Sequence, residues 1–493
     1  MSAAQSAAVP APVVQSSDGS VAASSSTLAR DLDAIFADPV LARGIIGVRV
    51  DSLRDGRTIY THMAGTHVVP ASNMKLVTMS VAATRLGWDF RYETRLEATG
   101  TIRDGRLDGD LVVVGSGDPT IGAPDGRPSS VFVAWADALW DAGVHRIDGR
   151  LIGDDNAFED AEPGAGWAWD YLSAGYATPT GALIYNENVG VVRATPGPSA
   201  GDPVAVTILP PGHGLEPDNR LTTGAAGSRA SLDVFRMAGE PRVVLTGSQP
   251  AGGRAAVQTV AVDNPTRYFV EALRLALLDR GIVVRDGAWD IDDLSEAPPA
   301  GGRRVLVRRE SAPLSSIAAS FLKVSQNLYG ETILRTLARA DGNVGTADGG
   351  KAVVRRTLAD WGVADDAIVM YDGSGLSRYN YVTADAIVTI LTRIWKDESL
   401  RGPFLAALPV GGVDGTLESR MKNPVLEGHV QAKTGTISNM RALSGFLDGP
   451  DGEKYVFSMI ANHFTAPSAQ IDAVVEKALA RIVSGSGSTA PGS

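Results

Sequence analysis

The stretch Pro70-Ala71-Ser72-Asn73-Met74-Lys75 leads into LVTMSVAATRL at residues 76–86, where apolar residues recur at helical spacing. This pattern predicts a helix that starts near Ser72 and carries Lys75 one turn later on the same face. The N-terminal end of a helix favours negative charge developing on the serine oxygen. A lysine whose pKa is lowered by burial or by a nearby cation can accept the serine proton. The stretch therefore predicts a serine nucleophile paired with a lysine base.

The Ser-x-x-Lys spacing has low specificity, because it occurs twice more, at Ser320–Lys323 and Ser419–Lys422. Two further elements follow Ser72 along the chain. Ser325-Gln326-Asn327 lies between an apolar helical stretch and LYGETILRTL, and Lys433-Thr434-Gly435-Thr436 contains the single KTG of the sequence. Each has an ordinary structural alternative, which is helix capping for the first element and a surface turn for the second.

The chemistry of these elements is complementary. The hydroxyl of Ser325 and the amide of Asn327 can relay protons and hold a substrate amide. The lysine of KTG, on an edge strand, can bind a carboxylate, which the hydroxyls of Thr434 and Thr436 can share. Gly435 would leave room for substrate beside the strand. In this order the three elements form the set typical of penicillin-binding proteins and class A β-lactamases.

The spacing narrows this set to one group. About 250 residues separate Lys75 from Ser325, and the chain resembles the D-alanyl-D-alanine carboxypeptidase/endopeptidase family of low-molecular-mass, class C penicillin-binding proteins, which carries a large insertion there. Single-domain β-lactamases lack it. The resemblance covers roughly residues 30–484; at Gln326 the family more often has Asp or Asn, and we expect this side chain to point away from the chemistry. Three further segments match the family: GSGDP at 115–119, DGSGLS at 372–377 and LPVGGVDGTL at 408–417.

The resemblance implies an α/β (α+β) fold, a penicillin-binding, β-lactamase-like domain whose antiparallel sheet is flanked by helices and interrupted by a large β-rich insertion. One amphipathic helix is expected in the insertion, at about 264–280. The expected parts of the chain are a disordered leader (1–27), a catalytic transpeptidase-like domain (28–96 with 305–484), the insertion (97–304) in two subdomains (about 97–190 with 262–304, and 191–261), and a flexible tail (485–493).

The resemblance also implies roles for the catalytic residues. Ser72 attacks the carbonyl of the penultimate D-Ala, and Lys75 is the base for acylation. Ser325 passes the proton to the leaving amine, while Asn327 orients Lys75 and the substrate amide. The product of the first step is an acyl-Ser72 intermediate, which β-lactams also form.

Substrate binding is implied at two places. Lys433, Thr434 and Thr436 bind the terminal carboxylate, and the backbone N–H groups of Ser72 and Thr436 form the oxyanion hole. Lys433 near Lys75 would also help to keep Lys75 neutral.

A second site would hold the side chain of the stem peptide. Tyr176 of the insertion, together with Leu376 and Ile437, would line it, and Asp170 beside Tyr171 could meet a cationic amine of diaminopimelate. The alternative for these residues is an ordinary place in the core or in a loop.

The composition excludes several other kinds of partner, nucleophile and metal site. A net charge of −11 argues against a nucleic-acid partner. The absence of cysteine excludes a thiol nucleophile, a cysteine zinc site and disulfides, and the six histidines form no HExxH. We therefore expect no metal and no cofactor. The expected partners are peptidoglycan stem peptides, with β-lactam antibiotics as covalent inhibitors.

The location and the exact activity stay open at this point. No run of about 18 apolar residues predicts a transmembrane segment, and no intact signal peptide is recognisable, which fits a cytoplasmic protein or a removed signal. The family resemblance favours a periplasmic or extracytoplasmic location. The alternatives to a DD-peptidase are a β-lactamase or esterase on the same fold, which the long insertion disfavours, and a non-catalytic peptidoglycan-binding protein, which the three intact elements disfavour.

Overall fold

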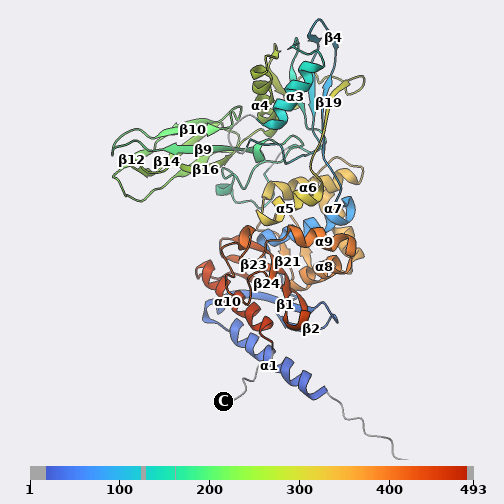
Figure 1. The fold of residues 1–493 in the computed structure, drawn as a ribbon, viewed down its shortest axis with the longest axis vertical. Helices are drawn as coiled ribbons and strands as arrows, with labels where there is room; N and C mark the ends of the chain where they lie inside the picture. Colours follow the sequence, from blue (N-terminus) through green and yellow to red (C-terminus); the bar gives the residue numbers. More distant parts are fainter. Residues whose placement is uncertain (1–17, 124–128, 161–162, 486–493) are drawn as a thin grey trace, which may run out of the picture.

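A five-stranded antiparallel sheet organises the lower part of the molecule in Figure 1. The computed structural model describes residues 18–123, 129–160 and 163–485. The strand order β2-β1-β24-β23-β22 sets the first strands of the chain beside the last ones and leaves β22, which carries KTG, at an edge. The strands are β1 (Ile45–Ser52), β2 (Thr58–His62), β22 (Val430–Ile437), β23 (Met440–Asp448) and β24 (Lys454–Asn462).

Helices cover both faces of this sheet. Successive side chains of a strand point to opposite faces, so Val456 and Ile460 of β24 enter the core formed by one helical layer, while Phe457 and Met459 enter the other core. The larger layer contains α2 (Met74–Leu86), α5 (Leu314–Lys323), α6 (Asn327–Ala340), α7 (Ala347–Asp360), α8 (Ala384–Lys396) and α9 (Glu398–Ala407); the smaller one contains α1 (Asp18–Phe36) and α10 (Ser468–Val483).

The insertion forms the upper part of the molecule (Figure 1). The chain enters it through β3 (Glu93–Ala98) and returns through β19 (Arg304–Glu310), which pairs antiparallel with β3. Two sheets, β18-β8-β6-β3-β19 and β17-β7-β5-β4, pack with two helices. The other elements are β4 (Thr101–Arg103), β5 (Arg106–Asp108), β6 (Leu111–Val114), α3 (Ser130–Asp141), β7 (Arg146–Ile147), β8 (Leu151–Asp154), α4 (Pro265–Asp279), β17 (Val283–Val284) and β18 (Ala288–Asp290).

A β-rich arm extends from the insertion to one side (Figure 1). Its apolar core is continuous with that of the rest of the insertion, because Val192 and Val243 of the arm belong to the same cluster as Phe269 of α4. We therefore propose one insertion domain with an arm in place of the two expected subdomains. The arm contains β9 (Val189–Thr195), β10 (Ala205–Leu209), β11 (Glu216–Asn219), β12 (Thr222–Gly224), β13 (Asp233–Arg236), β14 (Arg242–Thr246), β15 (Ser248–Pro250) and β16 (Ala256–Ala261).

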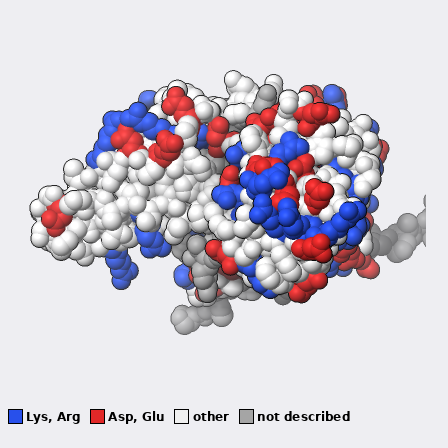
Figure 2. Space-filling view, turned by 90° about the horizontal axis from the view of Figure 1, so that it is seen from above, with Lys and Arg blue, Asp and Glu red and all other residues white. Residues whose placement is uncertain are grey.

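Charged side chains gather at the far end of the insertion. Seen from above, this end carries interleaved basic and acidic groups, whereas the arm is largely uncharged (Figure 2). Arg106 and Arg146 both pair with Asp148, and Arg285 pairs with Asp286. Pairing of this kind cancels much of the field of these arginines. In the described part of the chain no helix is long and apolar enough to cross a membrane.

The fold class is confirmed, but two helices differ from the predictions. The helix α1 begins at Asp18, so residues 18–27 are helical where a disordered leader was expected; extending a helix costs much less than nucleating one, and the alanines here favour it. The insertion contains α3 in addition to the one helix expected. Phe132, Trp135 and Leu139 bury one helical face of α3, a period obscured by the alternating Val-Phe-Val at its start. Residues 1–17 and 486–493 lie outside the described part.

Candidate active site

Ser72 lies in a single 3-10 turn, Ala71–Asn73, that leads directly into α2. The expected helix start is therefore confirmed with a tighter first turn. Ala71 has φ 47°, a left-handed conformation that costs about 1–3 kcal/mol for a residue with a side chain and that occurs most often at functional sites. The serine is partly exposed while its neighbours are buried. The turn thus presents the Ser72 hydroxyl at the surface of the catalytic part, at the positive end of α2.

Lys75 reaches the serine from inside the protein. Its Nζ donates to Ser72 Oγ at 2.9 Å, to Asn327 Oδ1 at 2.6 Å and to the carbonyl of Ser374 at 2.7 Å. The side chain is completely buried, and burial lowers the pKa of Lys75 to about 7, against the opposing effect of the carboxylates of Asp372 and Glu331. At neutral pH a large fraction of this amine can therefore act as a base.

The Ser325-Gln326-Asn327 element forms the start of α6. Ser325 has φ 69°, and Gln326 caps the helix by accepting from the N–H of Asn327 at 3.1 Å. The Nε2 of Gln326 donates to Glu187 of the insertion, so this side chain does point away from Lys75, as expected. Asn327 accepts from Lys75 and donates to the carbonyl of Tyr176 at 2.8 Å. Two residues of the insertion, Glu187 and Tyr176, therefore hold Gln326 and Asn327 in place through hydrogen bonds.

The KTG sequence lies within β22, beside the turn of Ser72. Gly435 has a structural reason in addition to the expected one: a Cβ there would lie 2.6 Å from the carbonyl oxygen of Pro70, so glycine permits the close approach of β22 to the turn. Lys433 is fully buried and donates to the carbonyl of Thr434 at 2.9 Å. Burial and the neighbouring Lys75 lower the pKa of Lys433. Two lysine amines thus share one buried region, and burial disfavours the charged form of each.

These elements meet at a pocket of about 550 Å³. The insertion supplies two aromatic rings, Tyr171 and Tyr176, whose centroids are 5.7 Å apart in an edge-to-face arrangement. The hydroxyl of Tyr171 accepts from Arg378 at 2.8 Å. The lining residues are Ser72, Tyr171, Tyr176, Ser325, Asn327, Gly375, Leu376, Thr436, Ile437, Ser438 and Ser468.

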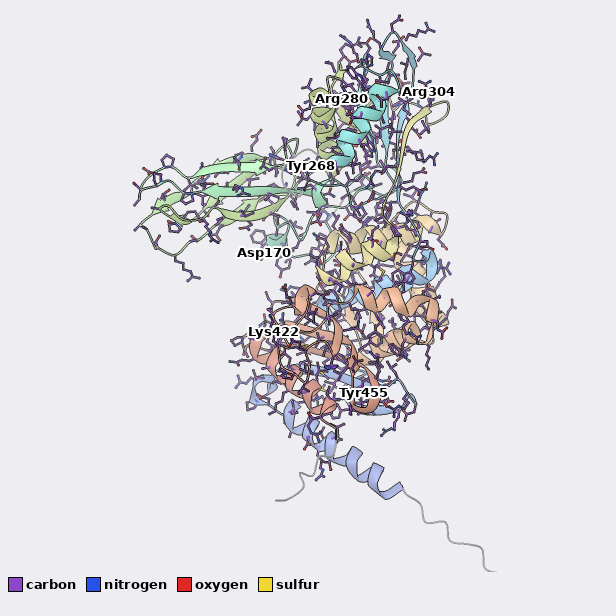
Figure 3. The ribbon with its side chains drawn as sticks, viewed as in Figure 1. Asp170, Tyr268, Arg280, Arg304, Lys422 and Tyr455 are labelled. Carbon is purple, nitrogen blue, oxygen red and sulfur yellow. The ribbon has the colours of Figure 1, made fainter. Side chains whose placement is uncertain are left out.

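Some predicted binding residues do not line this pocket. Asp170 is exposed and lies beneath the arm (Figure 3). It sits in the 3-10 turn Trp169–Tyr171, where successive side chains are about 120° apart, so Tyr171 faces the pocket and Asp170 does not. Lys433 and Thr434 are buried behind the pocket wall. The hydroxyl of Thr434 donates to that of Thr416 at 2.7 Å.

A buried acidic network that the sequence patterns did not predict lies behind Lys75. Asp372 accepts from the N–H groups of Gly375 at 2.8 Å and Ser377 at 2.6 Å, and also from Trp167 of the insertion at 2.9 Å. Glu331 of α6 accepts from the N–H of Ser374 at 2.9 Å. The DGSGLS segment had been recognised as a family match, and the alternation of Gly and Ser in it is the sequence pattern that points to a tightly held loop.

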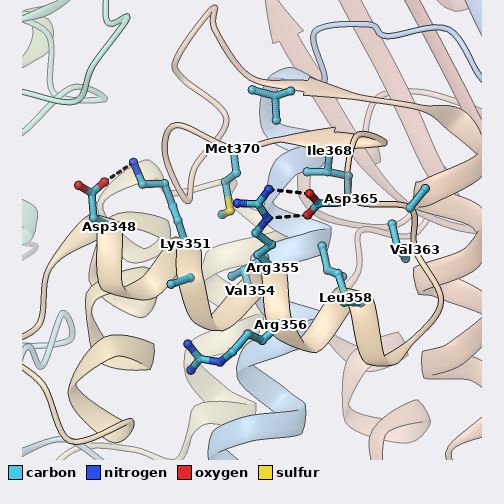
Figure 4. A pocket seen from close by; sticks show the side chains of 14 residues that line it. Asp348, Lys351, Val354, Arg355, Arg356, Leu358, Val363, Asp365, Ile368 and Met370 are labelled. Atoms are coloured by element: carbon cyan, nitrogen blue, oxygen red, sulfur yellow. Dashed lines mark hydrogen bonds and ion pairs between the residues drawn. The ribbon is translucent and has the colours of Figure 1, made fainter.

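Another pocket, of about 560 Å³, lies along α7 (Figure 4). Its charged groups are paired, with Arg355 bonded to Asp365 at 2.5 Å and Lys351 to Asp348 at 2.6 Å. None of the catalytic elements lines it. A cluster of Asp155, Asp290 and Asp292 in the insertion has oxygens within 4.8 Å of one another, but these groups have partners of their own, such as Thr266 for Asp155. Neither of these two groups of residues contains a serine beside a lysine.

Comparison with known proteins agrees with this geometry. Residues 28–482 match the D-Ala-D-Ala carboxypeptidase 3 (S13) family. The chain belongs to this family. The D-alanyl-D-alanine carboxypeptidase of Actinomadura sp. (strain R39) is 34% identical over 452 residues, which cover 90% of this chain and 82% of that protein. The family expected from the three sequence elements is thereby confirmed.

Solved structures with the same fold include penicillin binding protein 4 from Haemophilus influenzae. It has a TM-score of 0.78 and 24% identity, with 92% of this chain and 97% of that chain covered. The same protein complexed with a novel β-lactam has a TM-score of 0.73 over the same shares of both chains. The S13 chain described here therefore has the fold of a penicillin-binding protein, including its insertion.

Proposed function

We propose that this S13 protein is a serine-type D-Ala-D-Ala carboxypeptidase that trims peptidoglycan stem peptides through an acyl-Ser72 intermediate and is acylated by β-lactams. The observation that carries the proposal is the 2.9 Å contact between Ser72 Oγ and the buried amine of Lys75, whose pKa is lowered to about 7. The family and its named D-alanyl-D-alanine carboxypeptidases support the substrate class.

Acylation uses four side chains. Ser72 Oγ bonds to the carbonyl carbon of the penultimate D-Ala while its proton passes to neutral Lys75. The C–N bond then breaks, and the proton taken up by Lys75 passes through the Ser325 hydroxyl to the departing amine of the terminal D-Ala, which leaves Lys75 neutral again. Asn327 holds Lys75 in place through the 2.6 Å contact. Water later cleaves the acyl-Ser72 ester, and the free serine is regenerated.

Charge on the reacting oxygen is stabilised by backbone groups. Ser72 of the 3-10 turn and Thr436 of the edge strand β22 line the same pocket. This placement supports their backbone N–H groups as the oxyanion hole. Each donor of such a hole typically contributes about 3–4 kcal/mol to transition-state stabilisation. Endopeptidase action on D-Ala-diaminopimelate crosslinks uses the same acyl-enzyme and differs only in the leaving amine. Such substrates place the protein outside the cytoplasm, in the periplasm or its equivalent.

Mass spectrometry of the protein with and without benzylpenicillin tests this function. We expect one penicilloyl adduct on the peptide that contains Ser72, together with D-Ala release from a pentapeptide. Fast turnover of nitrocefin, with no D-Ala release, would instead identify a β-lactamase or esterase. Absence of both an adduct and D-Ala release would indicate a non-catalytic binding protein.

Replacement of Lys433 by alanine should discriminate between substrates by their terminal charge. We expect acylation by peptides that end in a free carboxylate to fall by about 10–100-fold, and acylation by uncharged esters to fall less. The reason is that, in the proposed complex, the buried amine of Lys433 turns from the carbonyl of Thr434 to make a charge-assisted contact with the carboxylate. Lys422→Ala, an exposed lysine, is the control. An equal loss for both substrates would assign Lys433 to tuning the pKa of its neighbour Lys75.

Replacement of Tyr176 by alanine should separate long from short substrates. The ring is half exposed over the pocket and can cover the methylenes of a diaminopimelate-like side chain, each worth about 0.8 kcal/mol when buried. We expect acylation by the long peptide to fall about 10-fold, while a bare acyl-D-Ala-D-Ala reacts as before, because remote binding energy can raise the acylation rate. The carbonyl of residue 176 that holds Asn327 stays in place in this variant.

Two other outcomes would change the assignment of Tyr176. An equal loss for both peptides would mean that its ring supports the fold of the site. No change for either would mean that the insertion does not touch the stem peptide, and that it has another role such as docking to the cell wall.

A further inference from the structure

A loop between α7 and α8 carries the carbonyl that holds Lys75. The segment Asp372–Ser377, called here the 372–377 loop, passes between α6 and the turn of Ser72. Contact is close on both sides: a Cβ on Gly373 would lie 2.3 Å from the carbonyl oxygen of Gly330 in α6, and one on Gly375 would lie 1.8 Å from the carbonyl oxygen of Ala71. The position of α6 therefore fixes the position of the loop, and the loop in turn fixes the positions of Ser72 and Lys75.

Glu331 is the side chain of α6 that accepts hydrogen bonds from this loop. Its Oε1 accepts from the N–H of Ser374 at 2.9 Å, and its Oε2 faces the N–H of Gly373 at 3.4 Å. The carbonyl of the same Ser374 accepts from Lys75 Nζ at 2.7 Å. On the other side of the loop, Thr78 of α2 donates to the carbonyl of Gly373 at 2.8 Å. One peptide segment thus connects the carboxylate of Glu331 to the amine of Lys75.

The charges around Glu331 come from three elements. Arg335, one turn along α6, lies 3.8 Å from its carboxylate and is itself 3.3 Å from Glu159 of the insertion. Asp372 of the loop and Lys75 of α2 interact with it electrostatically, and Lys433 of β22 interacts with Lys75 in turn. Glu331 is 4% exposed, and a carboxylate so deeply buried beside another is costly to keep ionised. Such a group is expected where its charge or its geometry is used.

We propose that Glu331 is a positioning residue for the base: through its hydrogen bonds to the 372–377 loop it holds the Ser374 carbonyl against Lys75, so that the lysine amine points at Ser72. This inference rests on the proposed function of Ser72 and Lys75 and adds the residue that sets the position and proton affinity of the base. Glu331 does not line the pocket of Ser72, so we expect it to affect acylation chemistry rather than substrate binding.

Glu331→Gln tests this role with an isosteric neutral side chain. The amide can still accept from Ser374, but its NH₂ group cannot accept from Gly373. Burial and the neighbouring Asp372 raise the pKa of Glu331 to about 7, and the negative charge that it carries above that pH, which favours protonated Lys75, is gone. We expect the acylation rate constant for a fluorescent penicillin at pH 8 to fall about 10-fold, with an unchanged concentration for half-maximal rate. The acidic limb of the pH profile should move to lower pH, because removal of a negative neighbour lowers the pKa of Lys75.

Glu159→Gln is the matched control, since it removes a carboxylate from the same arginine without contacting the loop. It should leave both the rate and the pH profile of acylation unchanged. Thermal unfolding of each variant separates loss of structure from loss of function. If Glu331→Gln does not fold, Glu331→Asp keeps the charge and shortens the side chain, and we expect it to acylate more slowly with the acidic limb close to that of the unmodified protein.

The outcomes that overturn the role of Glu331 are distinct from those that overturn the proposed function. A folded Glu331→Gln protein with the unmodified rate and pH profile, or a Glu331→Asp protein with the unmodified rate, contradicts the positioning role alone. An unmodified protein that forms no adduct at Ser72 contradicts both proposals.

Discussion

Ser72→Ala should abolish both β-lactam labelling and D-Ala release while the protein stays folded. The nucleophile supplies the bond on which the whole reaction depends, and its loss lowers turnover by about 10⁶-fold in well-studied serine proteases; we expect at least ~10³-fold here, because the empty oxyanion hole can still bind substrate and retain residual catalysis. Folding should be preserved because Lys75 keeps its contacts to Asn327 and to the carbonyl of Ser374. Intact mass spectrometry, D-Ala release and thermal unfolding measure the three effects.

The two other Ser-x-x-Lys sequences provide the controls. Ser320 lies in α5 and Ser419 follows the LPVGGVDGTL segment, and neither lines the pocket of Ser72. Ser320→Ala and Ser419→Ala should therefore label and turn over like the unmodified protein. Normal labelling of Ser72→Ala, together with loss in either of these variants, would move the active site away from Ser72.

Local sequence patterns predicted the helices beside Ser72 and Asn327 because each helix start depends on a few neighbouring residues. The helix after Ser72 follows from apolar spacing, and the start of α6 follows from polar residues before an apolar run. The strand of KTG was expected from the set of elements to which it belongs, since its burial pattern does not alternate. These elements were identified as one site by their order and chemistry, without any knowledge of the distances between them.

Contacts between distant segments could not be predicted in this way. Glu331 is an ordinary polar residue in the sequence of α6, and only the packing of Gly330 against Gly373 brings it to the loop that holds Lys75. Asp170 and Tyr171 are neighbours in sequence, and a single 3-10 turn decides which of them faces the pocket. The reason for Gly435 likewise depends on the approach of Pro70, which lies more than 360 residues earlier.

Lys75→Met should strongly lower the rate of acylation and abolish the dependence of that rate on pH. In the unmodified protein burial lowers the pKa of Lys75 to about 7. Because the neutral amine is the proposed base, the acylation rate should rise as the pH increases through about 7 and level off above it. Methionine has a similar length and no proton acceptor of comparable strength; a general base typically contributes about 10²–10⁴-fold to the rate. We therefore expect a loss of that size at pH 8 and a flat profile between pH 5 and 8.

Rates of labelling by a fluorescent penicillin across this range measure both effects, with Lys422→Met, whose side chain is exposed, as the control. A Lys75→Met protein that keeps the rising limb near pH 7 would show that a different group titrates, and the base would then have to be sought among the other buried groups of the site, of which Lys433 has the pKa lowered in the same direction.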